Sequence, residues 1–176
     1  FNIIMKTLYL VRHAKSSWKN TDLADLDRPL NKRGNRDAPR IGAYLKKQKI
    51  LPDLIISSPA NRAISTAKII AEQIGYSPSK IMQNQDLYTF SHNPEEISQV
   101  LAQISNKHRS VMLFGHNPIF TEAANFFGQQ NLDKLPTCGA MGFELALNNW
   151  YDIGQLELHS QLKFYVYPKI LPTPAV

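Results

Sequence analysis

Short apolar runs separated by polar or amphipathic stretches dominate the hydropathy pattern of this chain. Three of them are long enough for buried strands, at residues 7–12, 54–57 and 111–114. Weaker runs predict a short strand and two later strands, at residues 80–83, 141–147 and 162–167. Each of the three strong runs ends abruptly in polar residues, which the core alone does not explain.

Segments with apolar residues at helical spacing lie between these runs. The first expected helix covers residues 31–49, with Asn31 as its N-cap. Pro39 predicts that this helix starts later or kinks, because proline cannot donate the backbone hydrogen bond. Three further helices are expected, one following Pro59 and stopping at Gly75, one over residues 94–105, and one capped by Asn117 with Pro118 as its first residue.

Strands that alternate with helices predict right-handed crossovers and a mainly parallel sheet. We therefore expect an α/β fold, a three-layer α/β/α sandwich with helices on both faces of the sheet. The 176 residues suggest one domain, at residues 5–171, with terminal extensions at 1–4 and 172–176. Ligands of such folds bind at the carboxyl ends of the strands.

The composition is that of an ordinary globular protein, with 43% hydrophobic and 19% charged residues. The single cysteine, Cys138, excludes an internal disulfide framework and a cysteine-cluster metal site. No apolar run approaches the roughly 20 residues that span a bilayer, and residues 1–4 are too few for a secretory signal. We expect a cytoplasmic protein with no membrane partner.

The formal net charge of +6 favours an anionic partner. The basic residues are dispersed along the chain, and their densest run, residues 46–49, lies at the end of the first expected helix. Cations suit the helix dipole there, so a solvated helix end explains this run better than a nucleic-acid patch does. No basic stripe interleaved with aromatic residues appears, and we expect no nucleic-acid partner.

The three strong strands end in the same kind of chemistry. The first ends in Arg12 and His13, the second is followed one helical turn later by Arg62, and the third is followed by His116. Each residue alone has an ordinary explanation, as a structural histidine or a solvated arginine. In a parallel sheet, however, two imidazoles and two guanidiniums would converge at one edge. Guanidiniums bond phosphate oxygens in pairs, so a phosphoryl group would remove the cost of gathering these cations.

These residues carry a resemblance to a known family. The segments LVRHA at 10–14, SSPANRAISTA at 57–67 and GHNP at 115–118 resemble the three motifs of the histidine phosphatase superfamily, the phosphoglycerate-mutase-like fold. Ala14 stands where the usual first motif has glycine. The small SixA-type phosphohistidine phosphatases are closer still, through residues 27–34 and 135–139, Trp150, and Pro168-Lys169. The resemblance spans roughly residues 5–171.

The resemblance implies roles for the shared residues. His13 would attack phosphorus and form a phosphohistidine intermediate that water hydrolyses, while Arg12, Arg62 and His116 hold the equatorial oxygens. Further candidates for phosphate or substrate contacts are Arg28, Ser16, Ser17 and Asn20, with a surface arginine as the equal alternative for Arg28. Many superfamily members also use a carboxyl general acid. Asp86 lies in a suggestive region, with the boundary of a turn as its ordinary explanation.

Three functions fit this set of residues. The first is a phosphatase acting on phosphohistidine of a protein, such as a histidine-containing phosphotransfer protein. The second is a small-molecule phosphomonoesterase, and the third is a phosphate-binding module without turnover. A nucleophilic imidazole argues against the third, because binding needs only arginines. No cofactor or metal is expected, since the arginines would oppose a dication; inorganic phosphate or sulfate would suit the site.

Overall fold

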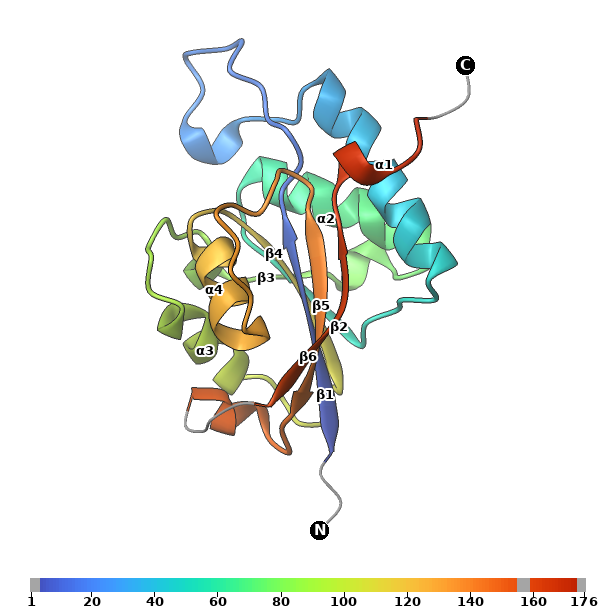
Figure 1. Ribbon diagram of the computed structural model, residues 1–176. Coiled ribbons are helices and arrows are strands. Elements are labelled where there is room, and N and C mark those ends of the chain that lie inside the picture. The colour runs from blue at the N-terminus through green and yellow to red at the C-terminus, as the bar shows by residue number, and fades with distance from the viewer. Residues whose placement is uncertain (1–3, 155–158, 174–176) are drawn as a thin grey trace.

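The computed structural model describes residues 4–154 and 159–173, which form one mixed sheet with helices on both faces (Figure 1). Its strands are β1 (Met5–Arg12), β2 (Leu54–Ser57), β3 (Met82–Gln83), β4 (Ser110–Gly115), β5 (Ala140–Ala146) and β6 (Ser160–Val166). Their order across the sheet is β3-β2-β4-β1-β5-β6. The strands β1 to β4 run parallel, whereas β5 is antiparallel to both β1 and β6. The mainly parallel sheet predicted from the sequence is confirmed.

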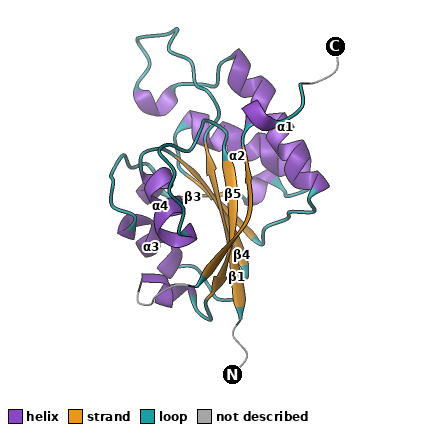
Figure 2. Ribbon diagram, viewed as in Figure 1, coloured by secondary structure: helices purple, strands orange, loops and turns teal. Residues whose placement is uncertain are grey.

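The helices form the two outer layers, as Figure 2 shows. They are α1 (Lys32–Lys47), α2 (Asn61–Ile74), α3 (Glu95–Ala102) and α4 (Ile119–Gly128). Short 3-10 turns are η1 (Asp25–Asp27), η2 (Pro78–Lys80), η3 (Gln85–Leu87), η4 (Trp150–Gly154) and η5 (Pro168–Ile170). The pair α1 and α2 covers one face of the sheet, and α3 and α4 cover the other (Figure 1). The α/β/α sandwich is therefore as expected.

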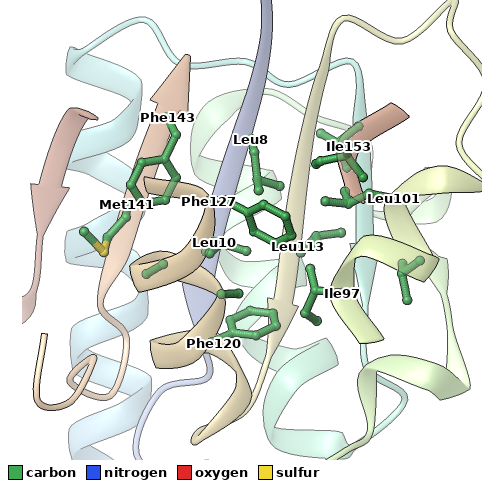
Figure 3. Packing of buried hydrophobic residues seen from close by; sticks show 14 of the residues in the cluster. Leu8, Leu10, Ile97, Leu101, Leu113, Phe120, Phe127, Met141, Phe143 and Ile153 are labelled. Carbon is green, nitrogen blue, oxygen red and sulfur yellow. The ribbon is translucent and has the colours of Figure 1, made fainter. Parts of the chain in front are cut away.

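Two apolar clusters hold these layers together, one on each face of the sheet. Figure 3 shows the larger one, in which Leu8, Leu10 and Leu113 of the strands meet Phe120 and Phe127 of α4. Their side chains are fully buried. Burial of apolar surface on both faces explains why β1 and β4 read as continuous apolar runs.

Two local expectations from the sequence are wrong. The helix α1 begins at Lys32, directly after Asn31, and continues through Pro39 as one helix, so the later start expected from Pro39 is wrong. Its inward face is buried against α2 and the sheet. Asn117 does not cap α4: the N-cap position belongs to Pro118, and no side chain caps that end. Instead, the Asn117 side chain bonds the backbone of Leu135. By contrast, Asn31 caps α1, its side chain accepting the N–H of Gly34.

The pairing of the strands brings their carboxyl ends together. β1 and β4 pair with Arg12 opposite Gly115, and the N–H of His13 donates to the carbonyl oxygen of Gly115 at 3.0 Å. On the other side of β4, the N–H of Ser58 donates to the carbonyl oxygen of Phe114 at 2.9 Å. The residues that follow β1, β2 and β4 are thus held side by side at one edge.

No helix in the described part of the chain is long and apolar enough to cross a membrane.

Candidate active site

A cavity of about 340 Å³ lies at the carboxyl ends of β1, β2 and β4, and we call it the histidine cavity. Its lining residues are Arg12, His13, Lys15, Ser16, Trp18, Asp25, Arg28, Arg62, Phe90, His116, Asn117 and Thr137. The structure therefore brings together the two histidines and the two arginines that the three strand ends supply.

His13 follows the last residue of β1, and its side chain is held as a neutral ring. Nδ1 lies 2.7 Å from the carbonyl oxygen of Ala14. Because a carbonyl can only accept, Nδ1 carries the proton and Nε2 keeps its lone pair. Burial lowers the pKa of His13 to about 3; the Ala14 hydrogen bond opposes this shift and neighbouring arginines reinforce it. A neutral imidazole with a free Nε2 is the form that nucleophilic attack requires.

His116 lies beside His13, with 5.2 Å between the ring centroids. Burial lowers the pKa of His116 to about 3, and the neighbouring His13 adds to the effect. Nε2 of His116 lies 2.8 Å from the hydroxyl oxygen of Ser58, whereas Nδ1 is buried and finds no partner in the described part of the chain. With the hydroxyl donating to Nε2, Nδ1 carries a hydrogen that can be donated to an anion.

The guanidinium of Arg12 is fixed by the backbone of Leu135. Nη1 of Arg12 donates to the Leu135 carbonyl oxygen at 2.9 Å, and Nδ2 of Asn117 donates to the same oxygen at 2.8 Å. The hydroxyl of Thr121 accepts the N–H of Leu135 at 2.9 Å and donates to Oδ1 of Asn117 at 3.0 Å. This network sets the position of Arg12 through main-chain atoms of a neighbouring loop.

Arg62, in the first turn of α2, is engaged by Asp25. Its Nη1 donates to the Asp25 carbonyl oxygen at 2.7 Å, and its Nη2 to Oδ2 of Asp25 at 2.9 Å. The hydroxyl of Tyr88 also donates to Oδ2 of Asp25, at 2.6 Å. Burial alone would raise the pKa of Asp25, but the hydrogen bonds from Tyr88 and Arg62 outweigh it and lower that pKa. Asp25 is therefore ionised at neutral pH.

Arg28 also lines the histidine cavity and is 7% exposed. Its guanidinium carbon lies 3.3 Å from the ring centroid of Trp18, a cation–π contact. Nη2 of Arg28 donates to the hydroxyl of Ser16, and Nη1 lies 3.4 Å from Oδ1 of Asp25. Arg28 is thus an ordered part of the cavity and not a solvated surface arginine.

Comparisons with known proteins support what the geometry indicates. Residues 8–88 match the family model of the histidine phosphatase superfamily (branch 1). An uncharacterized chloroplastic protein of Arabidopsis thaliana is 33% identical over 153 residues, which cover 84% of this chain and 70% of that protein. The chain belongs to the histidine phosphatase superfamily.

Two further relatives within the superfamily differ in how much they share. The crystal structure of a putative phosphohistidine phosphatase SixA from Agrobacterium tumefaciens is 26% identical, with a TM-score of 0.73, and the match covers 93% of this chain and 98% of that one. Phosphoglycerate mutase 1 of Saccharomyces cerevisiae is 41% identical over 71 residues, 39% of this chain but only 29% of the mutase. The SixA-type fold therefore spans nearly the whole chain, whereas the mutase shares a segment of it.

The side chains that line the histidine cavity carry a strong excess of positive charge. Its lining contains four cationic side chains, Lys15, Arg12, Arg28 and Arg62, against one carboxylate, Asp25. The Nε atoms of Arg12 and Arg28 are buried without a partner among the described residues. Buried donors without acceptors carry a desolvation cost that an anion would remove. The cavity is thus suited to a dianionic phosphoryl group.

Of the remaining candidates predicted from the sequence, some line the histidine cavity and others do not. Ser16 lines the histidine cavity, but Ser17 and Asn20 are not among its lining residues. Asp86 is an exposed residue of η3 and does not line the cavity either. The carboxylate that does line it is Asp25, which the sequence analysis did not single out.

Aromatic side chains also went unnoticed in the sequence. Trp18 and Phe90 line the cavity, and the ring centroids of Phe90 and Tyr88 lie 5.3 Å and 5.5 Å from that of His116. Their side chains come from two irregular segments without hydropathy periodicity. The one available signal was their place among polar residues, in SSWKN and TFSHN. In the structure, Trp18 and Phe90 are 68% and 51% exposed.

Proposed function

We propose that this chain is a phosphatase that removes phosphoryl groups from phosphohistidine of a protein through a covalent phospho-His13 intermediate. The observation that carries the proposal is the state of His13, which lies at the edge of a strongly cationic cavity. Its ring is neutral, with Nδ1 hydrogen-bonded to Ala14 and Nε2 without a partner among the described residues. A site built only to hold phosphate would need the arginines but not this imidazole.

In the first step, Nε2 of His13 attacks phosphorus in line as the bond to the substrate nitrogen breaks. The equatorial oxygens acquire charge that Arg12, Arg62 and Nδ1–H of His116 stabilise. The substrate imidazole leaves as a neutral molecule once its other nitrogen carries a proton. In the second step, water attacks the phosphorus of phospho-His13, releases inorganic phosphate and restores the neutral ring.

The state of Asp25 supports a nitrogen-linked substrate. Asp25 is the only carboxylate among the described residues that line the histidine cavity, and its hydrogen bonds to Tyr88 and Arg62 keep it ionised. An ionised carboxylate cannot protonate a leaving alkoxide, which alkyl phosphates need. When the substrate is phosphohistidine, the leaving group is a neutral imidazole, which needs little help from a general acid.

The alternative is a small-molecule phosphomonoesterase, favoured by the segment shared with phosphoglycerate mutase. One experiment distinguishes the two functions. The purified chain is incubated with a histidine-containing phosphotransfer protein phosphorylated on histidine and, separately, with para-nitrophenyl phosphate. We expect release from the protein with a kcat/KM at least about 100-fold above that for the ester, a difference of ~2.7 kcal/mol in transition-state stabilisation. A preference for the ester would favour the alternative, and turnover of neither would remove both.

A further inference from the structure

A second cavity, of about 550 Å³, lies between α1, the loop before β5 and the segment after β6. We call it the arginine cavity. Its lining residues are Arg33, Arg36, Asp37, Arg40, Pro136, Thr137, Tyr167, Pro168, Lys169, Leu171 and Thr173. Thr137 lines both this cavity and the histidine cavity, so the two meet at that residue. The chemistry proposed above gives the arginine cavity no role.

One carboxylate in the arginine cavity faces three guanidiniums. Oδ1 of Asp37 lies 3.1 Å from Nε of Arg36 and 3.2 Å from Nη1 of Arg40, and Oδ2 lies 3.9 Å from Nε of Arg33. The side chain of Asp37 is only 5% exposed. Lys169 adds a further positive charge to the lining. The cavity therefore carries a clear excess of positive charge, which an anionic ligand would balance.

The three arginines are not equivalent. Arg40 is mostly buried. Its Nη2 donates to the carbonyl oxygen of Pro172 at 3.0 Å and lies 3.4 Å from the carbonyl oxygens of Pro168 and Leu171. Arg40 therefore ties the C-terminal segment to α1.

The side chains of Arg33 and Arg36 are 53% and 60% exposed. Nη2 of Arg33 donates to the hydroxyl of Thr137 at 3.1 Å, at the junction of the two cavities. Among the described residues, Arg36 engages only Asp37, through Nε. Arg33 and Arg36 are thus the donors that a ligand can reach.

The walls of the arginine cavity indicate what kind of anion fits. Pro136, Tyr167 and Leu171 are half-buried and present apolar surface beside the guanidiniums. A small inorganic ion would use the charges but leave these side chains uncovered. A polypeptide segment would cover them while an acidic side chain reaches Arg33 or Arg36.

We propose that the arginine cavity is a recognition subsite for an acidic side chain, Asp or Glu, of the polypeptide that carries the phosphohistidine. This inference rests on the proposed function. The phosphohistidine enters the histidine cavity, and the chain flanking it passes Thr137 into the arginine cavity. Recognition of the flanking sequence would select protein substrates over small phosphorylated molecules.

Two synthetic phosphohistidine peptides of equal length test this. One carries three Glu on each side of the phosphohistidine, and the other carries three Gln. Phosphate release is measured with the full chain, with Arg36→Glu and with Lys46→Glu. Lys46 is exposed on the same helix and does not line the arginine cavity, so it makes a matched change of charge. Arg36→Gln, which keeps a donor for Asp37, guards against loss of folding.

We expect the unmodified chain to favour the Glu peptide about tenfold in kcat/KM, a factor equal to ~1.4 kcal/mol. Arg36→Glu should abolish this preference, Arg36→Gln should reduce it, and Lys46→Glu should retain it. The preference should also shrink between 50 and 500 mM NaCl, because exposed charges are screened.

Three results would overturn the inference. Equal hydrolysis of both peptides by the unmodified chain would leave the phosphatase function standing but remove the subsite. An equal loss of preference in Arg36→Glu and Lys46→Glu would reduce the effect to net charge. Hydrolysis of neither peptide would contradict the proposed function itself, and the subsite with it.

Discussion

The carboxylate of Asp25 lies 2.9 Å from the guanidinium of Arg62, on the wall of the cavity that also contains His13. Two nitrogens of Arg62 are occupied by this one residue, through its carboxylate and its carbonyl oxygen. The guanidinium of Arg62 is therefore already oriented before the substrate binds, and its remaining N–H groups are available for phosphate oxygens. The same carboxylate repels a phosphoryl dianion, so Asp25 orients Arg62 but lowers the affinity of the cavity for phosphate.

Asp25→Asn should separate these two effects. Removal of the negative charge should tighten the inhibition by inorganic phosphate by about tenfold, or ~1.4 kcal/mol. Two unit charges about 4 Å apart interact by ~1 kcal/mol in bulk water and by ~4 kcal/mol near a protein surface, so the lost repulsion is large enough. The turnover number should fall by about tenfold, because Arg62 loses its charged partner. The measurements are the inhibition constant of phosphate and kcat on a phosphohistidine substrate.

Asp22→Asn is the matched control, an exposed carboxylate of the same loop that does not line the cavity. It should change neither quantity. If Asp25→Asn weakens phosphate inhibition, Asp25 acts on the bound anion in some way other than repulsion.

The two buried histidines should make folding stability depend on pH. Their pKa values are lowered from 6.5 to about 3 in the folded chain. Between these values the unfolded chain binds more protons, so the free energy of unfolding rises with pH through this window. Stability is full above about pH 6.5 and is lost as the pH falls, by up to ~1.4 kcal/mol per pH unit for each histidine.

Urea unfolding between pH 7.5 and 5 measures this slope, before most carboxylates titrate. The double variant His13→Asn/His116→Asn should lose most of it. His92→Asn is the control, a histidine whose side chain is 77% exposed and lies outside the histidine cavity. An undiminished slope in the double variant would mean that other groups produce the pH dependence.

Asn117→Ala should affect both stability and turnover. The substitution removes the donor to the Leu135 carbonyl oxygen, which also holds Arg12, and the acceptor for Thr121. Two lost hydrogen bonds should cost about 1–3 kcal/mol in the free energy of unfolding. Displacement of Arg12 should lower kcat by about tenfold or more.

Asn125 provides a matched control for Asn117. Its side chain donates to the carbonyl oxygen of Leu132 and accepts the N–H of the same residue, and Asn125 does not line the histidine cavity. Asn125→Ala should destabilise the chain by a similar amount at unchanged kcat. Equal losses of kcat in both variants would mean that turnover follows stability and not the position of Arg12.

The parts of the site that lie at strand ends could be predicted from the sequence. Arg12, His13 and His116 follow buried apolar runs, and parallel pairing alone places such residues at one edge. Hydropathy periodicity carries this information because it is set by burial on both faces of the sheet.

The parts contributed by irregular segments could not be predicted. Asp25 and Trp18 lie in the long connection between β1 and α1, where no periodicity relates sequence position to place in space. Asp86 appeared the better candidate acid from its position in the sequence, but it is exposed outside the cavity. Asn117 similarly has the residue type of a helix cap, yet its tertiary contact with Leu135 takes precedence.

In the proposed mechanism, Nε2 of His13 accepts the phosphoryl group. The direct test uses a phosphotransfer protein labelled with ³²P on histidine, mixed with the chain, quenched in alkali within milliseconds and digested for mass spectrometry. We expect a transient label on the peptide containing His13, and neither label nor phosphate release in His13→Asn. Phosphate release by His13→Asn at a rate near that of the unmodified chain, or label on another residue, would contradict it.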